Sequence, residues 1–121
     1  MQKELLAIVE YGGYPDFSSL YQQLGYSVVQ INNMRKVIQY LKKHQPAVIV
    51  AEFNFQSDFR DRTSSLESLL AMTQRWPNIR VIIFYDQEYQ AQFAKLQERF
   101  TIHQTIAFPV SEEALSDALQ S

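Results

Sequence analysis

The sequence predicts a doubly wound α/β domain built on a parallel sheet of five strands. Short apolar runs rich in β-branched residues recur along the chain, and segments with the helical period lie between them. Several of these runs are apolar at consecutive positions, which is typical of strands buried on both faces of a parallel sheet. Strands and helices that alternate through short connections pack most simply as right-handed crossovers around one sheet.

The predicted strands and helices follow one another along the whole chain. The strands cover residues 5–10, 26–31, 47–53, 80–85 and 105–110. The five helices between and after them are predicted from apolar stripes at helical spacing: Phe17, Leu20, Tyr21 and Leu24; Met34, Val37, Ile38 and Leu41; Leu66, Leu69 and Leu70; Tyr89, Phe93, Leu96 and Phe100; Leu115, Ala118 and Leu119.

Polar and glycine residues at the ends of these stripes predict where the helices begin and end. Gly25 directly follows the first stripe, as expected of a residue that ends a helix. Ser64 with Glu67 forms a candidate capping box for the third helix. Asp86 and Ser111 are predicted N-caps of the fourth and fifth helices.

Composition narrows the functional classes. The 121 residues, 46% of them hydrophobic, predict a single domain over 1–121. A net charge of -2 argues against nucleic acid and anionic lipid as partners. The absence of cysteine excludes disulfides, thiolate nucleophiles and cysteine-bound metals. No run approaches the roughly 20 apolar residues of a membrane span, so a cytoplasmic location is expected.

Four side chains stand at the carboxyl ends of predicted strands, where functional groups of doubly wound sheets collect. These side chains are Glu10, Glu52, Tyr85 and Phe108. Glu52 belongs to the run "PAVIVAEFNF". In this run a strand with buried character ends on a carboxylate, and aromatic residues follow directly.

The order and lengths of these elements resemble the receiver domain of bacterial two-component response regulators over essentially the whole chain. The carriers of the resemblance are "LGYSVVQ" (24–30), "HQPAVIVAEF" (44–53), "WPNIRVIIFYD" (76–86) and "IAFPVSEEALSDAL" (106–119). The resemblance implies a flavodoxin-like (CheY-like) sheet with strand order 2-1-3-4-5. It also implies a cis bond between Phe108 and Pro109.

The resemblance further assigns roles to the residues at the strand ends. Receiver domains transfer a phosphoryl group from a histidine kinase to an aspartate, with Mg²⁺, a small hydroxyl residue and a lysine stabilising its charge. Glu52 falls at the phosphoacceptor position, and Glu10 and Tyr11 fall at the acidic metal positions. Tyr85 replaces the small hydroxyl residue, and Phe108 replaces the lysine. Nearly every group that would stabilise the transferred charge is therefore replaced.

These replacements predict a degenerate pseudo-receiver that is not an enzyme and has no catalytic residue, metal or cofactor of its own. Glu52 would then act as a permanent negative charge that partly imitates a phosphorylated aspartate. Alternatively, Tyr85 and Phe108 only fill the space of the lysine and the phosphoryl group. A divalent cation bound by Glu10, Glu52 and Asp86 is a further alternative.

A module of this kind is expected to act through a protein partner in signalling. One predicted interaction surface is the loop 53–65, with Phe53, Phe55, Phe59, Arg60 and Arg62 as contact residues. The same phenylalanines would instead enter the core if the loop folds back. The other predicted surface, implied by the resemblance, is the face of the fourth helix, fifth strand and fifth helix, through which a homodimer would form.

Two functions of other classes stay open on the sequence. An atypical phosphoacceptor in a two-component phosphorelay would use Glu52 or a nearby aspartate. A small-ligand sensor on a flavodoxin-like scaffold would stack a ring in a corner formed by Tyr11, Tyr85 and Phe108.

Overall fold

The structure is a computed structural model that describes residues 3–9, 15–53, 60–76 and 78–120, with only the main chain described for 60–65. Its elements in chain order are β1 (Lys3–Ile8), α1 (Ser18–Gln23), β2 (Tyr26–Ile31), α2 (Met34–Leu41), β3 (Val48–Phe53), α3 (Arg60–Thr73), β4 (Arg80–Tyr85), the 3₁₀ turn η1 (Gln87–Tyr89), α4 (Gln90–Arg99), β5 (Gln104–Ala107) and α5 (Glu112–Gln120). The five strands form one parallel sheet in the order β2-β1-β3-β4-β5. The predicted fold class and strand order are confirmed.

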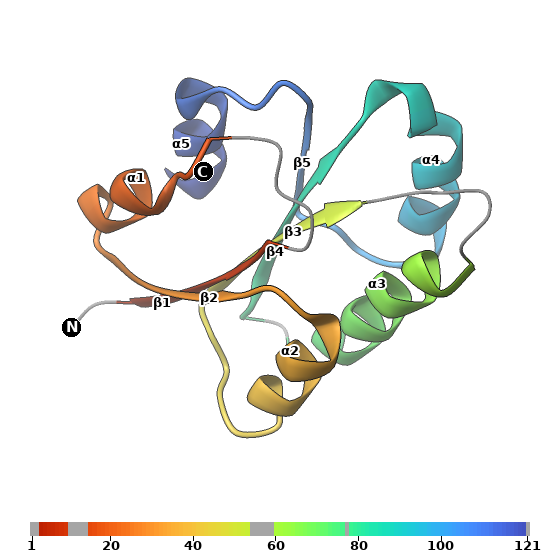
Figure 1. Ribbon diagram of the computed structural model, residues 1–121, viewed down its shortest axis with the longest axis horizontal. Coiled ribbons are helices and arrows are strands. Elements are labelled where there is room, and N and C mark those ends of the chain that lie inside the picture. The colour runs from red at the N-terminus through yellow and green to blue at the C-terminus, as the bar shows by residue number, and fades with distance from the viewer. Residues whose placement is uncertain (1–2, 10–14, 54–59, 77, 121) are drawn as a thin grey trace.

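Helices cover both faces of the sheet, with α1 and α5 on one side and α2, α3 and α4 on the other (Figure 1). Each face has its own apolar layer. The central strand β3 is buried at all six positions, because it contributes to both layers and has a neighbour on each side. None of the helices in the described part of the chain is both long and apolar enough to cross a bilayer.

The observed strands match the predicted ones closely in the middle of the chain and less well at its ends. β2 and β4 have the predicted bounds, and β3 starts one residue later than predicted. β1 covers 3–8 instead of 5–10, and β5 covers 104–107 instead of 105–110. The predicted fifth strand is too long because Pro109 has no N–H for a sheet hydrogen bond.

The predicted helix boundaries hold at three of the four places. Gly25 follows α1 with a φ of 93°, a left-handed conformation that favours glycine. Ser111 caps α5 by accepting a hydrogen bond from the N–H of Ala114 at 3.1 Å. Asp86 caps η1, which leads into α4, by accepting one from the N–H of Glu88 at 2.9 Å.

The predicted capping box of the third helix is wrong. α3 begins at Arg60, so Ser64 lies inside the helix. The carboxylate of Glu67 forms an ion pair with Arg99 of α4 at 3.1 Å, which directs it toward the neighbouring helix.

Candidate functional site

Glu52 lies at the end of the central strand and is buried, with 3% of its surface exposed. It shares a face of β3 with Val48 and Val50, because successive side chains of a strand alternate between the two faces. Those valines belong to the apolar layer under α1 and α5. The sequence therefore delivers a carboxylate to the predicted strand end and directs it into this layer.

The neighbour of Glu52 on β4 belongs to an aromatic cluster in the α1/α5 layer. This register partner is Phe84, which is fully buried. The rings of Phe17 and Phe108 both contact Phe84 edge-on, with centroids 6.5 Å and 6.2 Å away. Phe108 thus occupies the space beside β4 with an apolar ring, at the position where the resemblance places a lysine.

Tyr85 and Phe53 lie on the opposite face of the sheet from Glu52. Both rings pack against Phe93 of α4, Tyr85 stacked at 4.7 Å and Phe53 tilted at 5.0 Å between centroids. Phe53 is only 3% exposed, so its predicted role as a contact residue of an interaction loop is wrong. It is a core residue, because it is the last residue of the fully buried strand β3.

The main chains of Tyr85 and Phe108 are adjacent, but their rings are not. The N–H of Phe108 donates to the carbonyl oxygen of Tyr85 at 2.8 Å. The ring of Tyr85 packs in the layer of α2, α3 and α4, and the ring of Phe108 packs in the layer of α1 and α5. The two rings therefore do not form the predicted ligand-stacking corner. Phe108 and Pro109 follow β5 directly, and the predicted cis bond between them is confirmed.

Several predicted site residues lie outside the described part of the chain. These residues are Glu10, Tyr11, Phe55 and Phe59. Arg60 and Arg62 lie in α3 and not in a loop. The predicted interaction loop therefore ends before Arg60. Among the described residues, no group of three or more His, Asp or Glu side chains gathers where a metal ion would bind.

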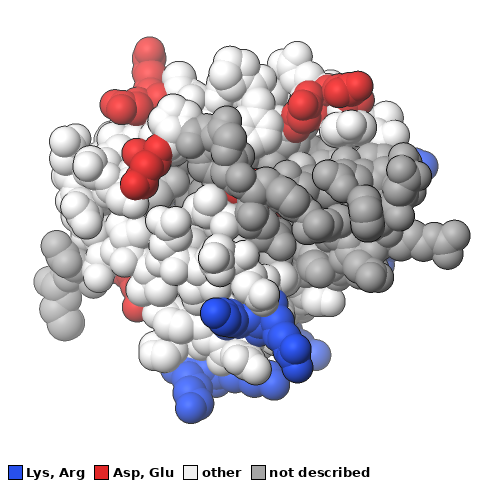
Figure 2. Space-filling model, viewed as in Figure 1, with Lys and Arg blue, Asp and Glu red and all other residues white. Residues whose placement is uncertain are grey.

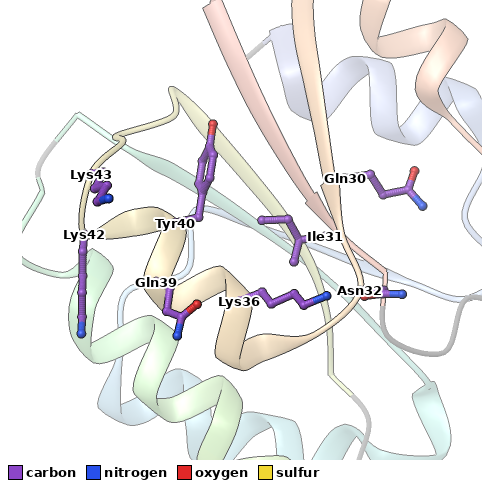
Figure 3. A pocket seen from close by; sticks show the side chains of 8 residues that line it. All are labelled: Gln30, Ile31, Asn32, Lys36, Gln39, Tyr40, Lys42 and Lys43. Atoms are coloured by element: carbon purple, nitrogen blue, oxygen red, sulfur yellow. The ribbon is translucent and has the colours of Figure 1, made fainter.

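The sequence interpretation missed one concavity of the described surface. It is an open groove of about 770 Å³ between the end of β2 and α2, lined by Gln30, Ile31, Asn32, Lys36, Gln39, Tyr40, Lys42 and Lys43 (Figure 3). We call it the β2–α2 groove. Lys36 extends from α2 toward Asn32 at the end of β2 (Figure 3).

The β2–α2 groove lies where basic side chains gather on the face shown in Figure 2. Lysine and arginine side chains gather over α2, whereas most acidic side chains on the same view lie at the opposite end (Figure 2). The sequence contains the signal: residues 17–51 include two lysine or arginine pairs, at 35–36 and 42–43, and no Asp or Glu. The overall charge of -2 conceals this local excess.

Comparisons with known proteins agree on the fold. No family model matches the sequence, and no curated protein matches it either. The structure resembles the chemotaxis response regulator CheY4 of Vibrio cholerae with a TM-score of 0.75 at 16% identity, covering 99% of this chain and 98% of that one. It resembles the signal receiver domain of a LuxO repressor protein from Vibrio parahaemolyticus with a TM-score of 0.70 at 14% identity, covering 99% and 88%.

A third similar structure comes from a protein with another task. It is described as belonging to a novel family of redox sensors in the streptococci that evolved from two-component response regulators. The TM-score is 0.75 at 19% identity, and the match covers 98% of this chain and 49% of that one. At these identities the comparisons establish a receiver-domain fold, as found in two-component signalling.

Proposed function

We propose that this chain is a non-phosphorylatable receiver-like module of bacterial signal transduction that acts by binding other proteins. One observation carries the proposal. The ring of Phe108 packs on Phe84, at the place where receiver domains present a lysine to the phosphoryl group. A phenylalanine supplies neither charge nor a hydrogen bond to a phosphoryl oxygen.

The other strand ends support the same proposal. Phosphoryl transfer depends on groups that stabilise the charge developing on the transferred oxygens. A hydroxyl at the end of β4 would be one such group, but the ring of Tyr85 packs on Phe93, in the layer opposite Glu52. Glu52 is also one methylene longer than an aspartate, which changes the geometry of an in-line attack. A buried carboxylate then remains as a fixed feature of the fold.

The streptococcal redox sensor supports the idea that a receiver-like fold serves other tasks. This chain cannot use thiol redox chemistry, because it contains no cysteine. Binding to a protein is a function that needs neither a cofactor nor a reactive side chain, and it fits the composition of the chain.

The face formed by α4, β5 and α5 is the partner surface that the resemblance favours. All four residues of β5 are only half-buried, so this edge of the sheet is open on the described surface. A homodimer through this face remains a prediction, which analytical ultracentrifugation over a range of protein concentrations would test.

The first testable prediction concerns phosphorylation. We expect that incubation of the wild-type protein with acetyl phosphate and Mg²⁺ leaves its intact mass unchanged, because Phe108 and Tyr85 replace the lysine and the small hydroxyl residue that stabilise the phosphoryl charge. A receiver domain with the aspartate and the lysine serves as the positive control in the same reaction. Glu52→Asp tests whether the longer carboxylate alone prevents the reaction, and we expect it to stay unmodified because Phe108 is still present.

A stoichiometric mass increase of one phosphoryl group on the wild-type protein would overturn the proposal and support the atypical phosphoacceptor. Glu52→Gln would then identify the acceptor, since loss of the modification in this variant assigns it to Glu52. Persistence would assign it to another residue.

A further inference from the structure

One face of α2 forms a wall of the β2–α2 groove. Lys36, Gln39, Tyr40 and Lys43 follow the spacing i, i+3, i+4 and i+7, so they lie on the same side of the helix and the turn that follows it. Met34, Val37 and Leu41 are buried on the other side against α3 and the sheet. The side of α2 that lines the groove is therefore held in place by the buried apolar side of the same helix.

The other wall of the groove is β2, whose outer edge has no strand beside it among the described residues. β2 has β1 as its neighbour in the described sheet and no strand on its other side. The carbonyl oxygen of Ile31 accepts a hydrogen bond from the N–H of Val9 at 3.0 Å, so the main chain of Ile31 faces β1. Because peptide groups alternate in direction along a strand, those of Val28 and Gln30 point outward. Gln30 lines the groove itself.

The charge of the groove defines the chemistry of its occupant. Lys36, Lys42 and Lys43 line it, and none of its lining residues in the described part of the chain is acidic. Ammonium groups and amides beside an open strand edge are complementary to a chain that carries carboxylates. Such a chain would gain main-chain hydrogen bonds from the edge and charge-assisted ones from the lysines.

We propose that the β2–α2 groove binds an extended acidic segment of a partner protein. The segment adds as a further strand to the outer edge of β2, and carboxylates on one of its faces pair with Lys36 and Lys43. The inference rests on the proposed function in one respect, because it takes the unphosphorylated protein as the form that binds.

The spacing of the lysines favours an extended peptide over a compact anion. Lys36 and Lys43 are seven positions apart, which corresponds to about 10 Å along a helix. Alternate side chains of a strand repeat every ~7 Å, so successive carboxylates on one face can reach both lysines. A single phosphate or carboxylate group would reach only one of them.

Nucleic acid fits the molecule less well than an acidic peptide. Lysine and arginine side chains gather at the α2 end of the face in Figure 2, while the whole chain has a net charge of -2 and most acidic side chains visible in that view lie at the opposite end. A long phosphate backbone that leaves the groove would be repelled by the remaining surface.

The experiment measures binding of a fluorescein-labelled peptide, in which glutamate alternates with valine, by fluorescence anisotropy at low ionic strength. We expect saturable binding to the wild-type protein and at least about tenfold weaker binding to Lys36→Gln/Lys43→Gln. The matched control is Arg75→Gln/Lys95→Gln, which loses the same amount of charge from exposed positions that do not line the groove and should bind as the wild type does. Circular dichroism and the urea midpoint confirm that both variants fold.

Two further probes test the two parts of the contact. A peptide with glutamine in place of glutamate should lose binding because it lacks carboxylates. A peptide methylated at its main-chain nitrogens should lose binding because it cannot donate to the edge of β2. Retained binding of either peptide would overturn the corresponding part of the proposal.

Other results would overturn the proposal as a whole. Absence of peptide binding, or equal weakening in the two double variants, would remove the groove as the peptide site. Binding of pyrophosphate or oligothymidylate without binding of the peptide would assign the groove to another class of ligand. Self-association that Lys36→Gln/Lys43→Gln abolishes, without peptide binding, would assign it to a second copy of the chain.

The failure of this inference is distinguishable from failure of the proposed function. Peptide binding is measured before any phosphodonor is added. If acetyl phosphate modifies the wild-type protein, the proposed function fails, whereas peptide binding to the untreated protein still supports the groove.

Discussion

Tyr40 shows how one residue at the β2–α2 groove joins two elements of the fold. Its hydroxyl donates a hydrogen bond to Glu4 of β1 at 2.5 Å, and its ring stacks on His44 with centroids 4.2 Å apart. Burial, followed by the hydrogen bond to Glu4, raises the pKa of Tyr40 from 10.0 to about 12. The folded state therefore keeps the phenol proton at pH values where an unfolded chain loses it.

The second prediction follows from this difference in the pKa of Tyr40. Stability from Tyr40 is fully present below pH 10 and is lost as the pH rises toward about 12, because the unfolded state binds fewer protons in that window. The urea midpoint of the wild-type protein should fall between pH 10 and about pH 12. We expect a smaller fall for Tyr40→Phe. The difference in tyrosinate absorbance between wild type and variant should titrate near pH 12. Titration of that difference near pH 10 would contradict the structure.

The residues of the candidate site show what a sequence pattern predicts and what it does not. The resemblance places Glu52 at the end of the third strand and Phe108 at the end of the fifth, and in the structure Glu52 lies in β3 and Phe108 directly follows β5, with β4 between the two strands. It does not predict which layer each ring enters, since a shift of one residue at a strand end reverses the face. Phe53 is a core residue of the layer of α2, α3 and α4, and the half-buried ring of Tyr85 packs against that layer.

Arg80 links two elements that are distant in sequence, the start of β4 and the end of α5. Its guanidinium donates to the carbonyl oxygen of Leu119 at 3.0 Å and to that of Ala118. These carbonyls belong to the last turn of α5, where the helix leaves its acceptors without intrahelical partners. A cation at this end also interacts favourably with the helix dipole.

The third prediction is that Arg80→Met destabilises the protein by about 1–3 kcal/mol, through loss of charge-assisted hydrogen bonds to the end of α5. Methionine keeps most of the apolar stem, so the loss reports on the guanidinium. The measurement is the free energy of unfolding in urea. Arg75→Met is the control, because Arg75 is exposed, and it should change stability by less than about 0.5 kcal/mol. Equal effects of the two substitutions would refute the role of Arg80.

The elements of this fold were predictable to different degrees. Helices with a short polar cap were located correctly, as Asp86 and Ser111 show, because a cap is a local signal. The start of α3 was not, since the helix begins at Arg60, ahead of the predicted cap at Ser64, and Glu67 of the predicted box pairs with Arg99, a residue distant in sequence. The groove beside α2 was missed for the same kind of reason. Its charge is visible in the sequence, but the open strand edge beside it appears only in the sheet.

At the scale of the whole molecule, the sheet order explains why the two ends of the sheet differ from its centre. β3 has a neighbour on each side and is buried at every position. β2 and β5 are the edge strands, and most of their residues are half-buried or exposed. Two edges are thus available for partners, the β2 edge beside the basic groove and the β5 edge between α4 and α5.

The fourth prediction concerns the exchange of amide hydrogens along this sheet. We expect exchange to be slowest in β3 and in the buried part of β4, and faster in β2 and β5, because edge strands open by local fluctuations with fewer buried contacts to break. NMR-detected exchange of individual amides measures this order. Protection in β5 as strong as that in β3 would contradict the described sheet.

The same measurement separates peptide addition at the edge of β2 from loose electrostatic contact. A peptide paired with β2 should slow the exchange of the outward N–H groups of Val28 and Gln30. The inward N–H groups of Val29 and Ile31 should change little, since they already face β1. A contact made only by Lys36 and Lys43 would bind the peptide without this alternating protection. The alternation is therefore the observation that an added strand requires and that charge attraction alone does not produce.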